Sequence, residues 1–318
     1  MKSQSVTAPS LTKKRYTFFT DVRRNRFSYL LILPALLYVL VFSYLSYPYM
    51  IIAFKNFNYK LGVFGSEWCG FKNFEFFLKS TNAPTVIRNT LVLNLLFIVT
   101  GTLTSLVLAI LLNELRSRVF VRTAQTMMLF PHYISWVVVS YILLAIFSNK
   151  NGLANQLLNA LGMKSVSWYT KADAWPTILV WMKIWKSAGM NAVIYLAAIT
   201  GIDESIYESA TIDGANRFQR IVSITVPLIM PTVCIMTLLA VGKIMNGDFG
   251  MIYALVGDQG ILYETTDVID TYVYRVLRQT GDPSQSMAIG LFQSLIGLVM
   301  VVGSNWIVKH TFHEGALF

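Results

Sequence analysis

A group of polar and aromatic residues lies inside an apolar stretch at about residues 172–200. Trp181 and Trp185 are four residues apart, so a helix would present both rings on one face. Lys183 and Lys186 would share a neighbouring face, and Asn191 follows within the same stretch. Aromatic rings can stack on sugar rings, while ammonium and amide groups bind hydroxyl and carboxyl groups. These residue types therefore suit a carbohydrate-binding site.

The lysines also indicate what kind of sugar the site would take. Two lysines near the middle of a membrane span are costly unless they face protein, a water-filled cavity or an acidic partner. Together with Lys243, in a later apolar stretch that ends near Asn246, they suit an anionic sugar such as a uronate oligomer. In the alternative, the lysines reach the membrane interface or pair with acids of another subunit, and the tryptophans pack between helices. Asn246 would then only end a helix.

The composition indicates that a bilayer surrounds much of the chain. Of its 318 residues, 55% are hydrophobic and 13% are charged, and the mean hydropathy is +0.54. Soluble domains carry about 25% charged residues. The formal net charge of +10 then marks cytoplasmic segments rather than nucleic-acid binding. Two separate cysteines, Cys69 and Cys234, and three histidines without ligand spacing predict neither a disulfide nor a metal site.

Six apolar stretches approach or exceed the length of about 20 residues that a transmembrane helix needs. They are expected at about 29–52, 86–113, 123–148, 172–200, 224–245 and 284–308. Pro131 lies within the third, where it predicts a kink. The segments 53–85, 149–171 and 246–283 are expected as external loops, the second with a short amphipathic helix that ends in glycine. The expected fold is all-α: a polytopic membrane protein with six transmembrane helices.

Basic residues predict the orientation of these helices. Lysines and arginines are dense in residues 1–27 and in the short connection near 114–122, so both are expected in the cytoplasm. Residues 1–27 are expected to form a cytoplasmic basic tail, and residues 28–318 a transmembrane domain with both chain termini in the cytoplasm. The first apolar run is too long for a cleavable signal peptide, so it is expected to remain in the cell membrane.

The polar segment from Glu208 to Pro227 separates two of the apolar stretches and must lie outside the bilayer core. Negative residues gather in its early part, where a helix N-terminus favours them. Gly214 then breaks the helix, and Arg217 and Arg220 follow on one face of a second turn. The segment thus predicts a helix, a glycine break and a second helix that another protein could receive. Composition alone would favour an ordinary connecting loop.

The spacing of Glu208, Ser209, Ala210, Gly214, Ile224 and Pro227 resembles the EAA loop of ABC importer permeases. That pattern reads E-A-A, three residues, G, nine residues, I, one residue, L-P. Ser209 and Val226 depart from it but keep a small and an apolar side chain. From about Ser28 onward the chain resembles a binding-protein-dependent sugar permease of the lipoprotein-type oligosaccharide transport subgroup. Further matching pieces are Leu33-Pro34, Trp68-x-Gly70-x-x-Asn73-Phe74, Asn89-Thr90, Phe130-Pro131-His132, Gly290-Leu291-Phe292 and Ser304-Asn305-Trp306.

The resemblance implies the type I ABC importer permease fold, with a core at about 85–309 and the coupling loop at about 201–223. It implies one of two homologous permease subunits, two ATPase subunits that bind ATP and Mg, and an extracellular lipid-anchored binding protein that delivers an oligosaccharide. Glu208 would pair with a basic residue of the ATPase, Ala210 and Gly214 would allow close approach, and Asp213 would cap or pair locally. The chain itself contains no phosphate-binding G-x-x-x-x-G-K-[ST] motif, so no cofactor and no enzymatic activity are expected.

Two other interpretations stay open. An ABC importer permease for a non-sugar solute would carry the same EAA loop. A membrane enzyme or a signalling subunit is the third, although no nucleophile, metal cluster or acid–base pair with suitable spacing supports an enzyme.

Overall fold

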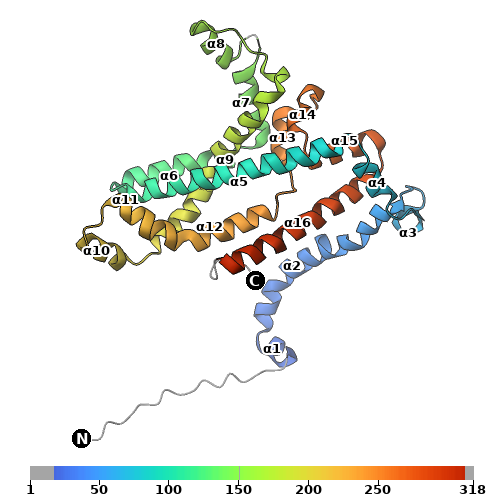
Figure 1. Cartoon of the computed structure of the whole chain (residues 1–318). Helices are drawn as coiled ribbons and strands as arrows, with labels where there is room; N and C mark the ends of the chain where they lie inside the picture. Colours follow the sequence, from blue (N-terminus) through green and yellow to red (C-terminus); the bar gives the residue numbers. More distant parts are fainter. Residues whose placement is uncertain (1–17, 150, 312–318) are drawn as a thin grey trace. The chain divides into compact units, whose positions relative to one another are not determined.

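The computed structural model describes residues 18–149 and 151–311 (Figure 1). These residues fall into two compact units that divide between Ile51 and Ile52. The first unit contains α1 (Phe18–Arg24), α2 (Arg26–Phe42) and most of the 3-10 helix η1 (Tyr44–Phe54). The first 17 residues of the expected basic tail lie outside the described residues.

The second unit contains the remaining elements in a predominantly helical arrangement. In chain order they are β1 (Lys55–Asn56), α3 (Gly62–Gly65), β2 (Glu67–Trp68), α4 (Lys72–Leu78), α5 (Ala83–Glu114), α6 (Arg118–Tyr133), α7 (Trp136–Phe147), α8 (Leu153–Ala160), η2 (Trp168–Thr170), η3 (Ala172–Ala174), α9 (Trp175–Thr200), α10 (Glu204–Ile212), α11 (Arg217–Arg220), the π-helix η4 (Ile221–Thr225), α12 (Val226–Val241), α13 (Phe249–Val256), η5 (Gly260–Leu262), α14 (Tyr263–Thr266), α15 (Ile269–Thr280) and α16 (Pro283–Thr311).

The central packing is between long helices. α9 packs along α5 and also contacts α6 and α12, while α16 contacts α12 and α15 (Figure 1). α10 and α11 lie together at one end of α12, and α13, α14 and α15 gather near the start of α5 (Figure 1). Buried apolar residues form three clusters between these helices, with Trp175, Phe77 and Tyr195 as their largest fully buried members.

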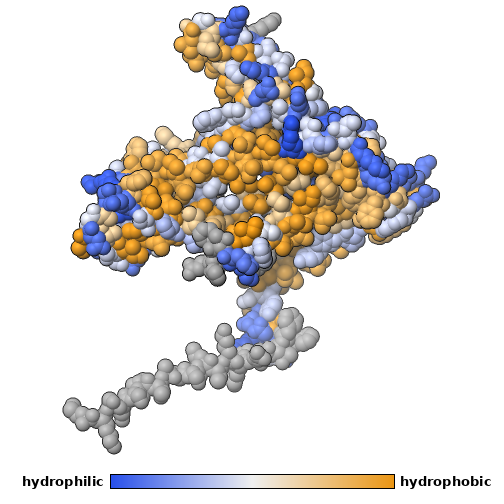
Figure 2. Space-filling view, in the orientation of Figure 1, coloured by the Kyte–Doolittle hydropathy of each residue, from blue (hydrophilic) through white to orange (hydrophobic). Residues whose placement is uncertain are grey.

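The outer surface of α5 is apolar, as a helix in contact with lipid requires. Its exposed aliphatic residues recur every three or four positions, so they lie along one face. Figure 2 shows apolar side chains over much of the helices in view and hydrophilic residues near their ends. The exposed large aliphatic residues of α5 are Val92, Leu95, Leu96, Val99, Leu103, Val107 and Leu111.

Fewer helices pass a length and composition test for a membrane span than the six that the sequence predicts. Among the described residues, four stretches pass: Arg26–Phe54, Ala83–Glu114, Arg217–Val241 and Pro283–His310. α6 and α7 pass only together, which gives up to five if this bent pair is one span. α9 has 26 residues, which is long enough, but its two lysines lower its hydropathy.

The third expected span, at 123–148, is two helices rather than one kinked helix. α6 already begins at Arg118, and α6 and α7 meet at an angle of 95°. Pro131 has no N–H to donate to the preceding turn, which weakens α6 near its end. The Ser135 hydroxyl then accepts a hydrogen bond of 3.3 Å from the Val138 N–H and so caps a new helix. The turn is therefore built by a helix end and a new helix start.

One of the segments expected as external loops is instead largely helical. Residues 246–283 contain α13, α14 and α15, and Ile269, Tyr272 and Val276 bury one face of α15. This spacing is helical, but the segment is too short and too polar to be recognised as a membrane span. In the segment 149–171, α8 and the positive φ of Gly162 confirm the expected amphipathic helix that ends in glycine.

The segment 53–85 corrects the all-α expectation in a small way, because β1 and β2 pair antiparallel. The Asn73 side-chain amide donates hydrogen bonds of 2.9 Å to the carbonyls of Ala53 and Lys55. Gly70 has a φ of +63°, and the Trp68 ring stacks on Phe54 with centroids 5.8 Å apart. The Trp-x-Gly-x-x-Asn-Phe spacing thus joins the hairpin to α4: Gly70 makes the turn from β2 into α4, and Asn73 satisfies backbone carbonyls beside β1.

Gly189 sets how closely α9 approaches α6. A Cβ atom at this position would lie 2.1 Å from the Met128 carbonyl oxygen. Gly189→Ala is therefore expected to push the two helices apart and to destabilise the fold by about 1–3 kcal/mol. The measurement is the thermal unfolding midpoint of the purified protein in detergent. Gly290→Ala, in α16, is the control, because nothing lies within 4 Å of its added Cβ. Equal midpoints for the two variants would contradict this packing.

Candidate functional site

The polar segment between α9 and α12 has the predicted helix, glycine break and second helix. α10 begins at an N-cap, Asp203, whose carboxylate accepts a hydrogen bond of 3.0 Å from the Ser205 N–H. This hydrogen bond lowers the pKa of the Asp203 carboxyl below its ordinary value. The cap thus stabilises α10 while the carboxyl is ionised, and its contribution is lost as the pH falls through the lowered pKa.

α10 ends in a Schellman motif that explains the spacing of Ala210 and Gly214. The Ala215 N–H donates to the Ala210 carbonyl at 2.9 Å, and the Gly214 N–H donates to the Thr211 carbonyl at 3.1 Å. Gly214 has a φ of +81°, and a Cβ added there would meet nothing within 4 Å. Within this chain, glycine is needed for its backbone conformation and not for space.

Side-chain hydrogen bonds hold the turn between α10 and α11 in one shape. Asn216 and Gln219 form a reciprocal capping box, with hydrogen bonds of 2.8 and 2.9 Å. Arg220 donates to the Thr211 hydroxyl at 2.9 Å. The Tyr207 and Thr225 hydroxyls, 2.9 Å apart, tie α10 to the start of the next membrane helix. The result is a rigid projection.

The projection exposes groups that a partner protein can bind. The side chains of Ile212 and Phe218 are 86% and 73% exposed, beside the charged residues of the segment. Exposed apolar residues with a polar surround are typical of a protein interaction site. The Glu208 carboxylate is also exposed, and it has no ion pair with any residue that the structure describes. Behind the projection, Pro227 lies in the first turn of α12, directly after the π-helix η4.

A cavity of about 460 Å³ opens between α5, α9 and α12 and the chain that follows α12. Its volume lies in the range of about 300–1,000 Å³ that small-ligand pockets occupy. Its wall combines aromatic and aliphatic side chains with amides, a carboxylate and two ammonium groups. The lining residues are Asn94, Phe97, Ile98, Gly101, Thr102, Lys183, Asn191, Tyr195, Met236, Leu239, Ala240, Lys243, Asn246, Gly247 and Asp248.

Two of the lining residues form an ion pair in the wall of this cavity. The Lys183 Nζ lies 2.7 Å from Oδ2 of Asp248, and the two side chains are 30% and 27% exposed. The other carboxylate oxygen of Asp248 accepts a hydrogen bond of 3.1 Å from the Met251 N–H, so Asp248 also caps α13. Lys243 lines the same cavity, and no described residue forms an ion pair with it. Two ammonium groups and one carboxylate leave the cavity with one excess positive charge.

The break between α12 and α13 forms part of the cavity wall, and amide side chains satisfy its carbonyls. The Asn94 amide donates to the carbonyls of Ile244 at 2.9 Å and Asn246 at 3.1 Å. The Gln293 amide donates to the Met245 carbonyl at 2.6 Å. These bonds anchor the break to α5 and α16. Irregular backbone is tolerated in a membrane protein where such partners exist or where it lines a cavity.

Asp270 fixes the last turn of this break. Its Oδ2 accepts hydrogen bonds from the Gly247 N–H at 2.5 Å and from the Gln293 amide at 3.0 Å. Gly247 packs so closely that an added Cβ would lie 2.4 Å from the Val268 side chain. Gly247, which directly precedes Asp248, is therefore held by its hydrogen bond to Asp270 and by its packing against Val268.

Lys186 has a different role from Lys183 in this structure. Its side chain is buried at 9% exposure, and its ammonium donates to the carbonyls of Pro131 at 3.2 Å and His132 at 2.9 Å, and to that of Ile134. The Trp136 ring also lies 5.1 Å from the ammonium. Lys186 thus holds the carbonyl end of α6 at the sharp bend, where cations are favoured.

Comparison with known proteins decides the family. The model of the family described as binding-protein-dependent transport system inner membrane component matches residues 101–312. Protein LplB of Bacillus subtilis is 36% identical over 97% of this chain and 96% of its own length. The polygalacturonan/rhamnogalacturonan transport system permease protein YteP of the same organism is 32% identical over 99% of each chain.

The chain belongs to the inner-membrane components of binding-protein-dependent transport systems. A solved structure agrees along nearly the whole length of the permease. It is a bacterial alginate ABC transporter in complex with an alginate pentasaccharide-bound periplasmic protein. One of its chains superposes with a TM-score of 0.84 at 32% identity, covering 92% of this permease and 98% of that chain. The permease therefore has the ABC importer permease fold and is itself a multi-pass membrane component rather than an enzyme.

The permease brings together four of the seven residues that the sequence suggests for a substrate pathway. Lys183, Asn191, Lys243 and Asn246 all line the cavity. Lys186 is committed to the α6 carbonyls, and neither tryptophan of the suggested set lines the cavity. Trp181 is 64% exposed and Trp185 is 43% exposed, on the outside of α9 in this chain.

Sequence reasoning missed several polar residues of the permease cavity, among them Asp248 and Asn94. Asp248 gives no local signal in the sequence, because its role as an ion-pair partner depends on a lysine 65 positions away. Asn94 gave a usable signal, because it is an amide inside an apolar span, where a polar residue is by default a candidate for function. Phe97, Thr102 and Tyr195 complete the wall without any distinctive signal in the sequence.

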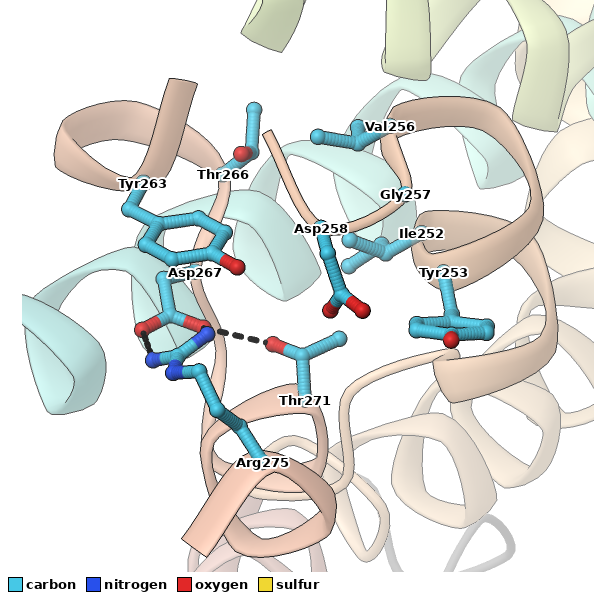
Figure 3. Close-up of a pocket in the computed structure, with 10 residues that line it drawn as sticks. All are labelled: Ile252, Tyr253, Val256, Gly257, Asp258, Tyr263, Thr266, Asp267, Thr271 and Arg275. Carbon is cyan, nitrogen blue, oxygen red and sulfur yellow. Dashed lines mark hydrogen bonds and ion pairs between the residues drawn. The ribbon is translucent and has the colours of Figure 1, made fainter. Parts of the chain in front are cut away.

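A second polar cluster of the permease stabilises structure and leaves no room for a sugar (Figure 3). Asp267 accepts a hydrogen bond of 2.8 Å from the Thr271 hydroxyl and pairs with Arg275, whose guanidinium lies 4.1 Å from the Tyr263 ring centroid. The space among these residues is about 10 Å³, at the lower limit for one water molecule. Asn89 ties the cluster to α5 by donating to the Glu264 and Asp267 carbonyls at 3.0 and 3.2 Å.

The different environments of Lys186 and Lys243 predict that only the first substitution lowers the stability of the permease. Lys186→Met leaves buried carbonyls at the α6 end without donors and is expected to cost about 1–3 kcal/mol. Lys243→Met removes an exposed ammonium from the cavity wall and is expected to leave stability unchanged within about 0.5 kcal/mol. Thermal unfolding of the two purified variants compares them directly. A Lys186→Met permease as stable as the wild type would mean that Lys186 does not hold the bend.

Proposed function

We propose that this permease is one of two transmembrane subunits of an ATP-driven importer that moves an acidic oligosaccharide into the cell. The observation that carries this proposal is the cavity between α5, α9 and α12, with its excess positive charge and its amide groups. Ammonium groups bind carboxylates, and an amide such as that of Asn191 suits sugar hydroxyls.

The comparisons support the substrate class. The name of YteP gives polygalacturonan and rhamnogalacturonan as its substrates, and the solved relative carries alginate. Polygalacturonan and alginate are polymers of uronic acids, which bear a carboxylate on each sugar. A permease cavity with two lysines and one aspartate matches such a substrate better than it matches a neutral sugar. An anionic solute that is not a sugar remains the alternative.

The proposed topology has six spans, with α9 counted as one and α6 with α7 as another. A span with two lysines is acceptable because Lys183 faces the cavity and Lys186 is satisfied by carbonyls. Both termini then lie in the cytoplasm, on the same side as α10 and α11, in agreement with the basic residues in the tail and near 114–122. The core of about 85–309 forms the transport unit, as in type I importers.

The proposed partners follow from the projection of α10 and α11. It docks into one of two ATPase subunits, which hold ATP and Mg, while a second homologous permease receives the other ATPase subunit. Glu208 pairs with a basic residue of the ATPase, and Ser209, Ala210, Asp213, Gly214 and Pro227 give the projection its shape. A lipid-anchored binding protein delivers the oligosaccharide from outside.

The transport mechanism is alternating access by rigid-body motion around the cavity. When ATP closes the ATPase pair, the projection moves with it. The Tyr207–Thr225 contact passes this motion to α12, and the far end of α12 forms part of the cavity wall. The same helix thus connects the ATPase side to the residues that hold the substrate.

Transport by the reconstituted complex tests this function. Proteoliposomes that contain the permease, its partner subunits and internal ATP should take up radiolabelled trigalacturonate when its binding protein is outside. Carboxyl-reduced, neutral trimer loaded on a suitable binding protein should be taken up more slowly. Uptake of a non-sugar anion and of no oligosaccharide would favour the alternative solute class, and absence of all uptake would contradict the proposal.

Glu208→Ala separates coupling from assembly. The change removes an exposed carboxylate from α10 without a loss of helix propensity, so the permease is expected to fold and to assemble. Loss of a charge-assisted contact with the ATPase should lower substrate-stimulated ATP hydrolysis about tenfold or more. Glu204→Ala, in the first turn of the same helix, is the matched control. Full stimulation in the Glu208→Ala complex would contradict the assigned role.

A further inference from the structure

The Lys183–Asp248 ion pair occupies the position that a substrate carboxylate would take. Both side chains line the cavity, and each retains more than a quarter of its exposure. Asp248 occupies one of the three N–H donors of the Lys183 ammonium, so an incoming carboxylate meets a lysine whose charge is already neutralised. Lys243, in contrast, offers its ammonium to the cavity without a competing ion-pair partner among the described residues.

We infer that Asp248 acts as an internal competitor of the substrate carboxylate at Lys183, and this inference rests on the proposed function. In the empty cavity Asp248 neutralises Lys183, and in the loaded cavity a carboxylate of the sugar replaces it. A partly exposed ion pair is weak enough to be exchanged in this way. Lys243 then gives the substrate its initial attraction, and Lys183 gives it a reversible second contact.

The geometry allows Asp248 to release Lys183 without unfolding its surroundings. Oδ1 accepts a hydrogen bond from the Met251 N–H, whereas Oδ2 contacts Lys183. The cap of α13 thus survives when the ion pair opens. The neighbouring Gly247 is held by Asp270, so the backbone stays in place while the ion pair exchanges.

The exchange gives the transporter low affinity where it needs to release its cargo. A pathway must bind a substrate well enough to admit it and weakly enough to let it leave. Two unpaired lysines would hold a polyanionic sugar strongly, whereas a resident carboxylate that returns to Lys183 favours departure. Asp248 therefore determines the specificity and release of acidic sugars and is not a passive helix stop.

Substrate binding to the assembled transporter tests the inference. The permease complex in lipid nanodiscs, without the binding protein, is titrated calorimetrically with trigalacturonate and with its carboxyl-reduced, neutral counterpart. Asp248→Asn keeps an N-cap for α13, since asparagine caps as well as aspartate, but frees Lys183. We expect the Kd for trigalacturonate to fall by up to about fivefold, with no change for the neutral trimer.

A double-mutant cycle shows whether Asp248 acts through Lys183. Lys183→Gln should weaken trigalacturonate binding, and adding Asp248→Asn to it should then have no further effect. Asp173→Asn is the control, because it removes the same charge from an exposed position outside the cavity. The Asp173→Asn complex should bind trigalacturonate with the wild-type Kd. These variants remain informative even if one single variant assembles poorly.

Several outcomes would overturn the inference. One is a Kd for trigalacturonate that Asp248→Asn leaves unchanged, and another is an equal fall in the Kd for the neutral trimer. A fall in Kd that Asp248→Asn still causes in the Lys183→Gln background would also overturn it, as would a wild-type complex that does not bind trigalacturonate. Each differs from failure of the proposed function, which is judged by uptake of oligosaccharide into proteoliposomes by the wild type with its binding protein.

Discussion

Backbone groups at two helix breaks must find hydrogen-bond partners away from bulk water, and much of the permease is arranged to provide them. At the end of α6 the partner is the Lys186 ammonium, and after α12 the partners are Asn94, Gln293 and Asp270. A buried donor or acceptor left without a partner costs about 1–3 kcal/mol. These four side chains come from four different helices. The hydrogen bonds to the backbone groups at these two breaks therefore also fix how α5, α9, α15 and α16 pack.

The same constraint gives the two lysines of α9 different roles. Lys183 and Lys186 are three residues apart, and helical geometry directs them to neighbouring but different surroundings. One meets the carbonyl end of α6 and becomes part of the fold. The other reaches the cavity, where its neighbour is a carboxylate on a flexible side chain. A lysine on a helix of a membrane protein can thus be a structural cap or a site residue, and only its partners distinguish the two.

The sequence predicted what depends on local pattern and missed what depends on distant pairing. The apolar runs and the Glu208–Pro227 spacing located most of the long helices and the projection, because hydrophobic length and glycine conformation are local properties. Asn94 pairs with carbonyls about 150 positions away, and Lys186 with carbonyls more than 50 positions away. Nothing in a neighbouring stretch of sequence specifies such pairs. For the same reason, Pro131 predicted a kink but not a turn of 95°.

α12 places the projection of α10 and α11 and the cavity on one continuous element. The Tyr207 and Thr225 hydroxyls join α10 to the π-helix before α12, and sixteen residues later the chain enters the break that carries Asp248. A helix of this length spans about 24 Å and transmits displacement as a rigid rod. The Schellman turn at Gly214 keeps the projection equally rigid. Motion at the projection must then appear where α12 ends, at the wall that holds the Lys183–Asp248 ion pair. The position of α12 and the binding of a solute in the cavity are consequently coupled through the break between α12 and α13.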